Sequence, residues 1–472
     1  METAITYERL FVNLGPAIVR AYSLTIQEGS NSHGYISLMT ILEKELYDAI
    51  LESNPVFVVV LYNSEDNEAK PLFTGIITDL NTSVQGDQYL IQVTANGSTY
   101  SMDMTPRSRT FQDPDRTNRQ LLTEVITGGK YGLYQTTIEE KPQEQLFIQY
   151  EETDWEFLQR FTSAYGVRIF PVNQDSLVLL RIGLGEEVTE AEWDELSYKV
   201  SQDLVSHHYL TENYPDQEQQ WNCLRYTVTT YDLLSLGSKI TFHGQEMYIG
   251  KVTRVLNQGI LINQYTLYFP SGLWVPQYDN EKLKGISIMG TVKDVQRNKV
   301  QVELVNNAAG GQEGRRWFAY STMAASPDGS GWYAMPQAGE TVRLFCPDGK
   351  EQNAYTLTCI ATNAGSDKTV IQDWDIQALF GPDGSQVCFT ETGIMMKGGN
   401  SEIILTNDGQ VSLQNCQKLT LDTGERLKLE AAGEMKILSG QEVLLAGSQS
   451  TVKVHSGGID IKGSEVQFNV EV

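Results

Sequence analysis

The sequence predicts a mainly β protein: tandem small β-barrels with an α/β insertion between them, an OB-type barrel neck, and a C-terminal needle built as an intertwined β-helix. Three observations support this prediction. A strand pattern occurs twice in the N-terminal half, five short strand-like runs follow it, and a pair of apolar residues recurs at every eighth position near the C-terminus. The predicted divisions are a first barrel at 1–95, the insertion at 96–204, a second barrel at 205–272, a linker at 273–284, the neck at 285–362, a linker at 363–382 and the needle at 383–472.

The composition supports folded domains and argues against nucleic acid as a partner. Hydrophobic residues make up 40% of the 472 residues and charged residues 20%, so each part can bury a core. The formal net charge of -25 repels phosphates, whose binding requires clustered lysine and arginine. The longest strongly apolar run, 56–62, is too short for a membrane helix of ~18 residues. Because the N-terminus also lacks a signal-peptide pattern, we expect synthesis in the cytoplasm without use of the general secretory route.

The two barrels are predicted from a duplicated segment. Residues 72–80 align position by position with residues 247–255. An aromatic residue, a glycine and a threonine keep the same spacing in both, at Phe73, Gly75, Thr78 and at Tyr248, Gly250, Thr253. Glycine within a strand marks a bulge or a sharp bend, as at the corner of a small barrel. The alternative is a chance match over nine positions of β-rich sequence.

Between the barrels the sequence is mixed α/β. Residues 116–126 have the apolar spacing of a helix. Residues 153–164 predict a second helix, because Thr153 can cap it and Glu156 stands at the capping-box position. The acidic residues around its start are expected to have surface and capping roles rather than a catalytic one; they are Glu151, Glu152 and Asp154.

The neck is predicted from five short alternating strands with glycine-rich turns, the strand number of an OB-type barrel. OB barrels that bind oligonucleotides use a basic groove and stacking aromatic side chains. Trp317, Trp332 and Tyr333 supply aromatic rings, but the sequence shows no basic groove. We therefore expect no nucleic acid on this barrel.

The needle is predicted from the eight-residue repeat. Residues i and i+2 of a strand point to one face, so each repeat is a short strand with two inward apolar residues followed by a turn. The predicted needle core consists of Ile403, Leu405, Val411, Leu413, Leu419, Leu421, Leu427, Leu429, Met435, Ile437, Val443, Leu445, Val452, Val454, Ile459 and Ile461. Val466 and Phe468 form its predicted apolar tip.

The repeat length also bears on the number of chains. Eight residues of strand and turn cannot enclose a core alone. Either three repeats of one chain form each coil, or three chains contribute one repeat each. The second arrangement gives a needle of roughly 45–50 Å at the usual strand spacing, and the sequence favours it.

The order of these parts resembles the VgrG and contractile phage-tail hub–spike family. The resemblance is carried by Phe73–Thr78 in the first barrel, Arg107–Gln112 after it, the block Gln149–Phe161, and Trp332–Val342 in the neck. It implies a homotrimer whose six barrels form a ring that seats on a hexameric inner tube protein among baseplate proteins. It also implies a spike that pierces the target envelope when a sheath contracts, with a separate PAAR-like tip protein at its end.

The sequence predicts no enzyme, cofactor or metal site. The linker at 363–382 is too short for a catalytic domain, and no HExxH, CxxC or HxH motif occurs. Some related needles hold iron through inward histidines, but His455 shares the outward phase of Lys453. His207 and His208 are adjacent, so on a strand they would point to opposite faces. The alternative function is a trimeric β-solenoid fibre or adhesin that binds a surface receptor.

Overall fold

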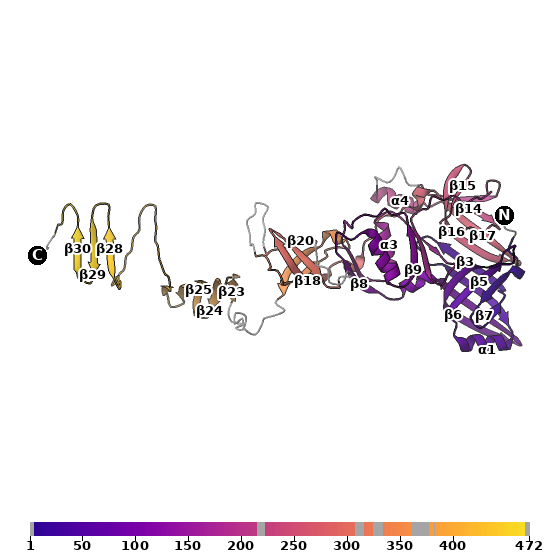
Figure 1. Ribbon diagram of the computed structural model, residues 1–472, viewed down its shortest axis with the longest axis horizontal. Coiled ribbons are helices and arrows are strands. Elements are labelled where there is room, and N and C mark those ends of the chain that lie inside the picture. Colours follow the sequence, from indigo (N-terminus) through magenta and orange to yellow (C-terminus); the bar gives the residue numbers. More distant parts are fainter. Residues whose placement is uncertain are drawn as a thin grey trace. The chain divides into compact units, whose positions relative to one another are not determined.

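The computed structural model describes residues 4–214, 222–306, 316–323, 334–360, 377–381 and 383–467. The chain is mainly β and forms several sheets whose neighbouring strands are almost all antiparallel. It divides into two compact units, 1–363 and 364–472, which are described separately (Figure 1).

The first unit is built around one twelve-stranded sheet, in the order β13-β14-β17-β16-β3-β4-β7-β6-β5-β1-β2, with β15 paired to β16. Its first part consists of β1 (Leu10–Asn13), β2 (Ile18–Val19), β3 (Ser23–Gly29), β4 (Tyr35–Leu42), β5 (Phe57–Asn63), β6 (Ala69–Gln85) and β7 (Gln88–Gly97). Helix α1 (Lys44–Ser53) lies against the far end of the long β6–β7 hairpin (Figure 1).

The second part of this sheet repeats the strand order of the first. It consists of β13 (Tyr198–Gln202), β14 (Leu224–Thr230), β15 (Lys239–Phe242), β16 (Gln245–Asn257) and β17 (Ile260–Tyr268). The duplicated segments lie in β6 and β16, each between equivalent neighbours. The pairing of β16 with β17 shifts register at Gly250. The equivalent pairing of β6 with β7 shifts at Thr78, three residues beyond Gly75. A Cβ at Gly75 would instead meet Asn96 O and the Phe73 ring, so close packing accounts for this glycine.

The insertion contains four helical segments, the first of which is a 3-10 helix at Ser98–Asp103, and two small sheets. Its strands are β8 (Arg107–Phe111), β9 (Gly132–Thr136), β10 (Phe147–Glu152), β11 (Ile169–Val172) and β12 (Val178–Ile182). The second predicted helix is present as α3 (Asp154–Ser163), with both hydrogen bonds of the capping box formed. The first is shorter than predicted: α2 (Asn118–Thr123) continues as a π-helical turn, Glu124–Gly128.

Two helices were not predicted from the sequence, α1 and α4 (Leu204–Asn213). The expectation that His207 and His208 lie on a strand is wrong, because both are in α4. The side chain of Asp203 caps this helix by accepting a hydrogen bond from the Ser206 backbone N–H. The cap therefore stabilises a helix here, although the spacing of apolar residues does not indicate one.

The neck region forms a five-stranded sheet in the order β20-β19-β18-β21-β22, and an isolated bridge between Tyr320 and Thr356 links its two end strands. The strands are β18 (Ser287–Gln296), β19 (Lys299–Leu304), β20 (Trp317–Ala319), β21 (Thr341–Phe345) and β22 (Tyr355–Ile360). Leu146 and Ile148 of the insertion pack into the core of this sheet. Trp332 and Tyr333 lie outside the described residues.

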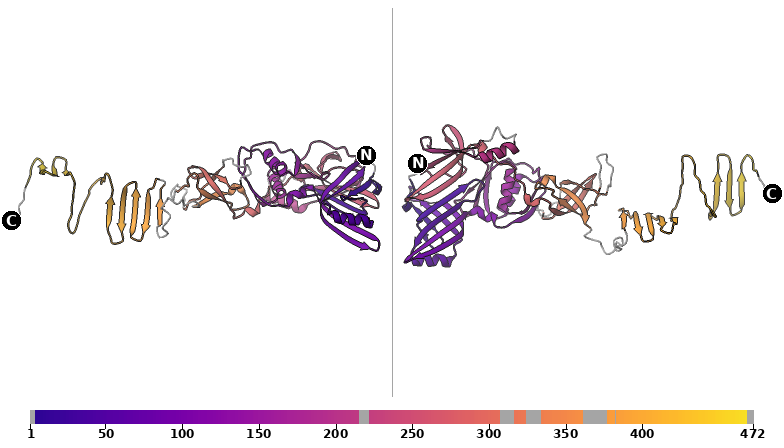
Figure 2. Two further views of the ribbon diagram at one scale, coloured as in Figure 1. Left: turned by 60° about the horizontal axis from the view of Figure 1, so that its bottom comes forward. Right: turned by 180° about the vertical axis from the view of Figure 1, so that it is seen from behind.

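The second unit contains two antiparallel sheets with strands in sequence order (Figure 2). They consist of β23 (Gln377–Phe380), β24 (Gln386–Thr390), β25 (Gly393–Gly398), β26 (Ser401–Thr406), β27 (Val411–Gln414), and then β28 (Glu442–Ala446), β29 (Thr451–His455), β30 (Gly458–Lys462). The eight-residue units within 393–414 and 442–462 therefore pair as hairpins within the chain rather than as a wound β-helix. A strand-and-turn unit of this length suits both arrangements, because only the choice of partner strand differs.

Candidate functional site

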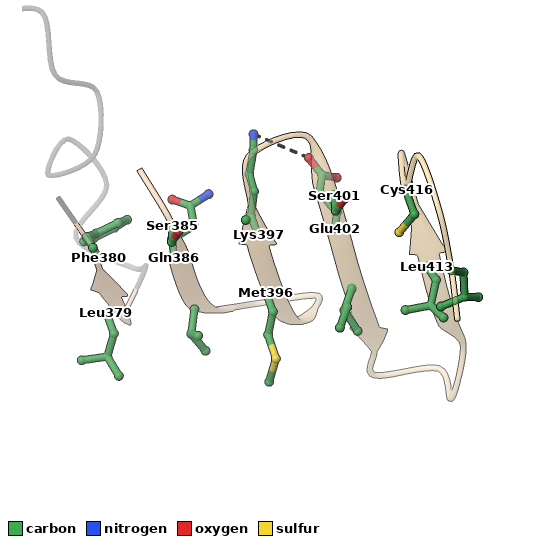
Figure 3. Close-up of a pocket in the computed structure, with 15 residues that line it drawn as sticks. Leu379, Phe380, Ser385, Gln386, Met396, Lys397, Ser401, Glu402, Leu413 and Cys416 are labelled. Atoms are coloured by element: carbon green, nitrogen blue, oxygen red, sulfur yellow. Dashed lines mark ion pairs between the residues drawn. The ribbon is translucent and has the colours of Figure 1, made fainter. Parts of the chain in front are cut away.

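Each of the two sheets of the second unit presents an apolar face. In the first sheet, directly paired residues form one row through Leu379, Val387, Met396, Ile403 and Leu413. Figure 3 shows Leu379 of β23, Met396 of β25 and Leu413 of β27 pointing the same way. A second row on this face runs two residues away through Phe389, Ile394, Leu405 and Val411. In the smaller sheet the paired rows are Val443, Val454, Ile459 and Leu445, Val452, Ile461.

This face is uncovered in the single chain. It borders an open hollow of about 580 Å³. Leu413 is 50% exposed and Val411 is 69% exposed, although both lie in paired strands. Exposing contiguous apolar rows in water is unfavourable at about 25 cal/mol per Å², and such a surface marks an interaction site. The face therefore needs a partner surface.

The other predicted needle residues are placed differently. Leu419, Leu421, Leu427, Leu429, Met435 and Ile437 lie between β27 and β28, outside any strand, and are exposed. Val466 is exposed, and Phe468 lies outside the described residues. His455 shares the Lys453 face of β29 and contacts Asp460 at 3.3 Å.

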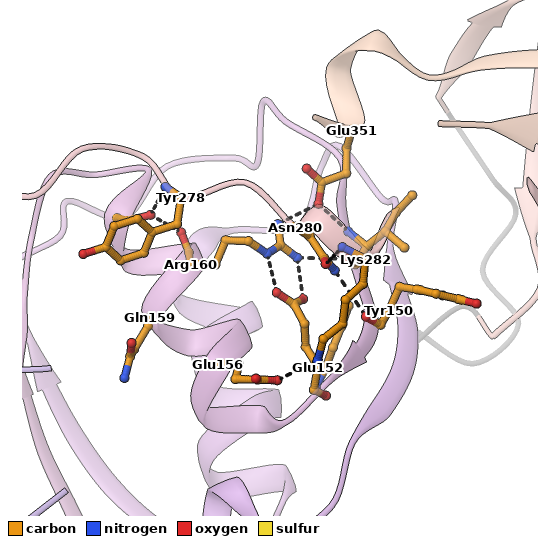
Figure 4. Close-up of polar contacts among 12 residues, drawn as sticks. Tyr150, Glu152, Glu156, Gln159, Arg160, Tyr278, Asn280, Lys282 and Glu351 are labelled. Atoms are coloured by element: carbon orange, nitrogen blue, oxygen red, sulfur yellow. Dashed lines mark hydrogen bonds and ion pairs between the residues drawn. The ribbon is translucent and has the colours of Figure 1, made fainter. Parts of the chain in front are cut away.

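A buried ionic cluster joins the insertion to the neck sheet. The Arg160 guanidinium on α3 donates two hydrogen bonds to Glu152, at 2.7 and 2.8 Å, and one to Glu351 at 2.7 Å. It also donates to Ile148 O at 2.9 Å, while Glu351 Oε1 accepts from Ile148 N–H at 3.1 Å. Figure 4 shows Arg160 between the two carboxylates, which come from different parts of the chain. We call Arg160, Glu152 and Glu351 the junction cluster.

Burial controls the electrostatics of the junction cluster. All three side chains are at most 8% exposed. Burial opposes the charge on Arg160, but Glu351 and Glu152 outweigh it, so the pKa of Arg160 lies above its ordinary value. The expectation of surface roles for Glu152 and Asp154 is wrong. Asp154 is fully buried as well, and accepts hydrogen bonds from Arg109, Gln149 and Tyr131.

A second buried junction joins both halves of the large sheet to the insertion. Arg254 of β16 pairs with Glu28 of β3, and the Glu28 carboxylate also accepts a hydrogen bond from Asn173 Nδ2 at 2.9 Å. Gly34 and Gly97 leave room for Asn173, because a Cβ at either glycine would collide with its side chain. Nothing in the sequence around Glu351 or Asn173 signals these roles, since each partner is more than 100 residues away.

Neither junction offers reactive chemistry to a substrate, because its charged groups are buried and mutually paired. Among the described residues, no group of three or more His, Cys, Asp or Glu is placed to hold a metal ion. No helix of the described chain is long and apolar enough to cross a membrane. The geometry supports binding and mechanical coupling.

Comparison with known families gives one match, which covers part of the large sheet and most of the insertion. Residues 48–194 match the phage tail baseplate hub (GPD) family. Residues 48–194, called the hub segment below, are thus similar to phage tail baseplate hub proteins. The hub segment includes Glu152 and Arg160, whereas Glu351 lies beyond it. No curated protein matches the chain.

Solved structures share the fold of the hub segment and its surroundings. A chain of the E. coli c3393 protein, a component of the type VI secretion system, has a TM-score of 0.52 at 13% identity, covering 74% of this chain and 99% of that chain. The half-lidded Francisella PdpA–VgrG complex contains a chain with a TM-score of 0.54 at 9% identity, covering 86% of this chain and 87% of that chain. A chain of the lidded Francisella PdpA–VgrG complex has a TM-score of 0.55 at 9% identity, covering 86% of this chain and 79% of that chain.

Proposed function

We propose that this chain is the trimeric central spike of a contractile injection system, which seats on a hexameric inner tube and pierces the target envelope when the sheath contracts. The observation that carries the proposal is the uncovered apolar face of the second unit, on a chain that also holds a hub segment. Three copies of this face, turned toward a common axis, would cover one another. Each chain would then contribute strands to a β-helix needle.

The repeated halves of the large sheet support the tube-binding role. Each chain carries two similar strand arrangements, so three chains present six similar units. A three-fold assembly of this kind can match a six-fold tube. The proposal includes the predicted divisions of the chain into two barrels, neck and needle. It also includes baseplate proteins and a separate PAAR-like tip protein as partners, and a place in an assembled particle that acts outside the cell.

The experiment compares two neighbouring substitutions in the full-length chain, Leu413→Asp and Ser412→Asp. Leu413 lies in the apolar row, while Ser412 pairs with Ile404 on the opposite face. We expect light scattering to give about three times 52.8 kDa for the wild type and for Ser412→Asp. Leu413→Asp should lower this mass, because a carboxylate would enter the apolar interface.

A monomeric wild type would refute the trimeric spike. Equal masses for both variants would show that the apolar row is not the trimer interface.

A further inference from the structure

The large sheet consists of two repeats of the same strand arrangement, β3–β7 and β13–β17. The contact between these two repeats shows how one can join another. The outer edge of β16 carries two strands in succession: β15 pairs with Gln245–Tyr248, and β3 pairs with Lys251–Val255. Because β15 belongs to the second repeat and β3 to the first, the β3–β16 pairing is the contact between repeats. The sheet is continuous across this contact.

The equivalent edge in the first repeat is open. On β6, the neighbour β5 pairs with Ala69–Ile76, and Val56 O, just before β5, accepts a hydrogen bond from the Ile77 backbone N–H. Beyond that point β7 covers one edge of β6 as far as Gln85. Among the described residues, no strand covers the other edge over Asp79–Gln85.

The strand that would fit this edge is also unpaired on one side. The order β3-β4-β7-β6-β5 of the first repeat corresponds to β13-β14-β17-β16-β15 of the second, so β13 is the counterpart of β3. Strand β13 pairs with β14, and within the described chain no strand pairs with its outer edge. All five of its residues are exposed. An open edge of this kind is a template for another strand.

We propose that β13 of one copy of this chain adds to the open edge of β6 of a second copy, as β3 adds to β16 within the chain. We call this contact the β6–β13 seam. Each copy supplies one donor strand and one acceptor edge, so the contact is head-to-tail and can close into a ring. The seam rests on the proposed function for the number of copies, which is three.

The internal contact also fixes the register of the seam. A row of paired residues runs from Ile26 to Ile77 through Ile36 and Ala95. The matching row in the second repeat runs from Val200 to Ile249 through Tyr226 and Leu267. Both rows end at the residue just before the register shift. The shift changes which residues share a face of the strand, so we align the two repeats on the shift and not on the match of Gly75 with Gly250. In this alignment Val200 is the counterpart of Ile26, and Ile249 is that of Ile77.

Ile26 pairs with Arg254, which lies five residues after Ile249 (249 to 254). The residue five positions after Ile77 is Thr82. The seam therefore places Val200 opposite Thr82, and Tyr198 opposite Val84, since antiparallel partners move in opposite directions along the two strands.

The side chains on the two edges match in this register. Tyr198 and Val200 share one face of β13, where the Tyr198 ring packs edge-on against Phe242 at 5.5 Å. Both are 47% exposed, so their apolar surface is only half covered. On β6, Val84 is 53% exposed, and Thr82 accepts a hydrogen bond from the Tyr47 hydroxyl of α1. The seam would cover these half-exposed side chains together.

The test is disulfide cross-linking of the full-length chain. Val200→Cys with Thr82→Cys places two thiols at directly opposite positions, whose Cα separation of about 4.5–5.5 Å lies within the range of a disulfide. Mild oxidation should produce covalent dimers and trimers on a non-reducing gel. The matched control, Val200→Cys with Ser83→Cys, puts the second thiol on the other face and should remain uncross-linked. The single variants give the background from native cysteines such as Cys359 and Cys416, which are exposed.

The outcomes separate the seam from the proposed function. A trimeric mass without cross-linking of Val200→Cys/Thr82→Cys would overturn the seam and leave the trimeric spike standing. Equal cross-linking in the Ser83→Cys control would also overturn it, because the register would be wrong. A monomeric mass would overturn both. The seam would be established if the wild type has a trimeric mass and only the Val200→Cys/Thr82→Cys variant forms cross-linked species.

Discussion

Replacing Arg160 by methionine is the sharpest test of the junction cluster. Methionine is flexible and similar in length, so it fills most of the vacated space. The substitution removes the guanidinium that donates to Glu152, Glu351 and Ile148 O. It therefore leaves two carboxylates in a site where their side chains are only 7% and 8% exposed.

The expected cost follows from this burial. Removing one partner of a buried ionic group costs about 3–5 kcal/mol, because the remaining charge is uncompensated. At about 1.4 kcal/mol per factor of ten, local opening of this region should become roughly a hundred- to several thousand-fold more frequent. Replacing both carboxylates by glutamine in the same chain, as Glu152→Gln and Glu351→Gln, should recover much of the loss.

The assay is native-state hydrogen exchange measured by mass spectrometry. A chain with several domains does not unfold in one step, so a global midpoint would not isolate this region. Arg160→Met should increase exchange in peptides of β10, α3 and the neck turn that carries Glu351.

Arg119→Met is the matched control. Its ion pair with Glu140 spans 3.7 Å, and the two side chains are 57% and 48% exposed. A pair of this kind contributes less than about 1 kcal/mol. If Arg160→Met changed exchange no more than Arg119→Met does, the reasoning about an uncompensated buried charge would be refuted.

Three further predictions concern the first unit. Thr153→Ala should destabilise α3 by about 1 kcal/mol, seen as faster exchange in its first turn. Gly97→Ala should cost about 1–3 kcal/mol because its Cβ meets Asn173. The cost should be smaller in an Asn173→Ala background, as measured by a double-mutant cycle of local opening free energies from hydrogen exchange. Burial, partly offset by Asp103, lowers the pKa of His33. The unfolded state therefore takes up a proton first, so stability should fall as the pH drops below about 6.5, and His33→Gln should flatten this loss in a pH series.

Local signals in the sequence predicted local structure well. Thr153 and Glu156 stand three residues apart and form both bonds of the capping box, because a cap depends only on neighbouring residues. The strand pairs that flank Gly250 are also present. The second unit shows where this reasoning stops. The eight-residue period determines which residues share a face, but not which strand, of the same or another chain, lies alongside.

The sequence pattern did not predict the polar contacts between residues far apart in the chain. Glu351 meets Arg160 across 191 positions, and its own neighbours resemble any exposed turn. Acidic residues at the start of a helix usually are solvated, so the sequence predicts surface positions for Glu152 and Asp154. Arg160 and Arg109 bring cations to them from other turns and strands, which only the folded chain reveals.

The junction cluster also sets the direction in which the neck sheet is held against the insertion. Leu146 and Ile148 pack into the neck core, but apolar contact is non-directional and permits sliding or rotation. The planar guanidinium of Arg160 accepts partners only in fixed directions, and it holds Glu152 through two nitrogens and Glu351 through a third. Orientation of the neck on the hub segment is thereby set by the ionic cluster, while adhesion comes from the apolar core. Glu351→Gln should consequently preserve the mass of the assembly yet raise hydrogen exchange where the neck meets α3, since a neutral amide holds Arg160 less firmly.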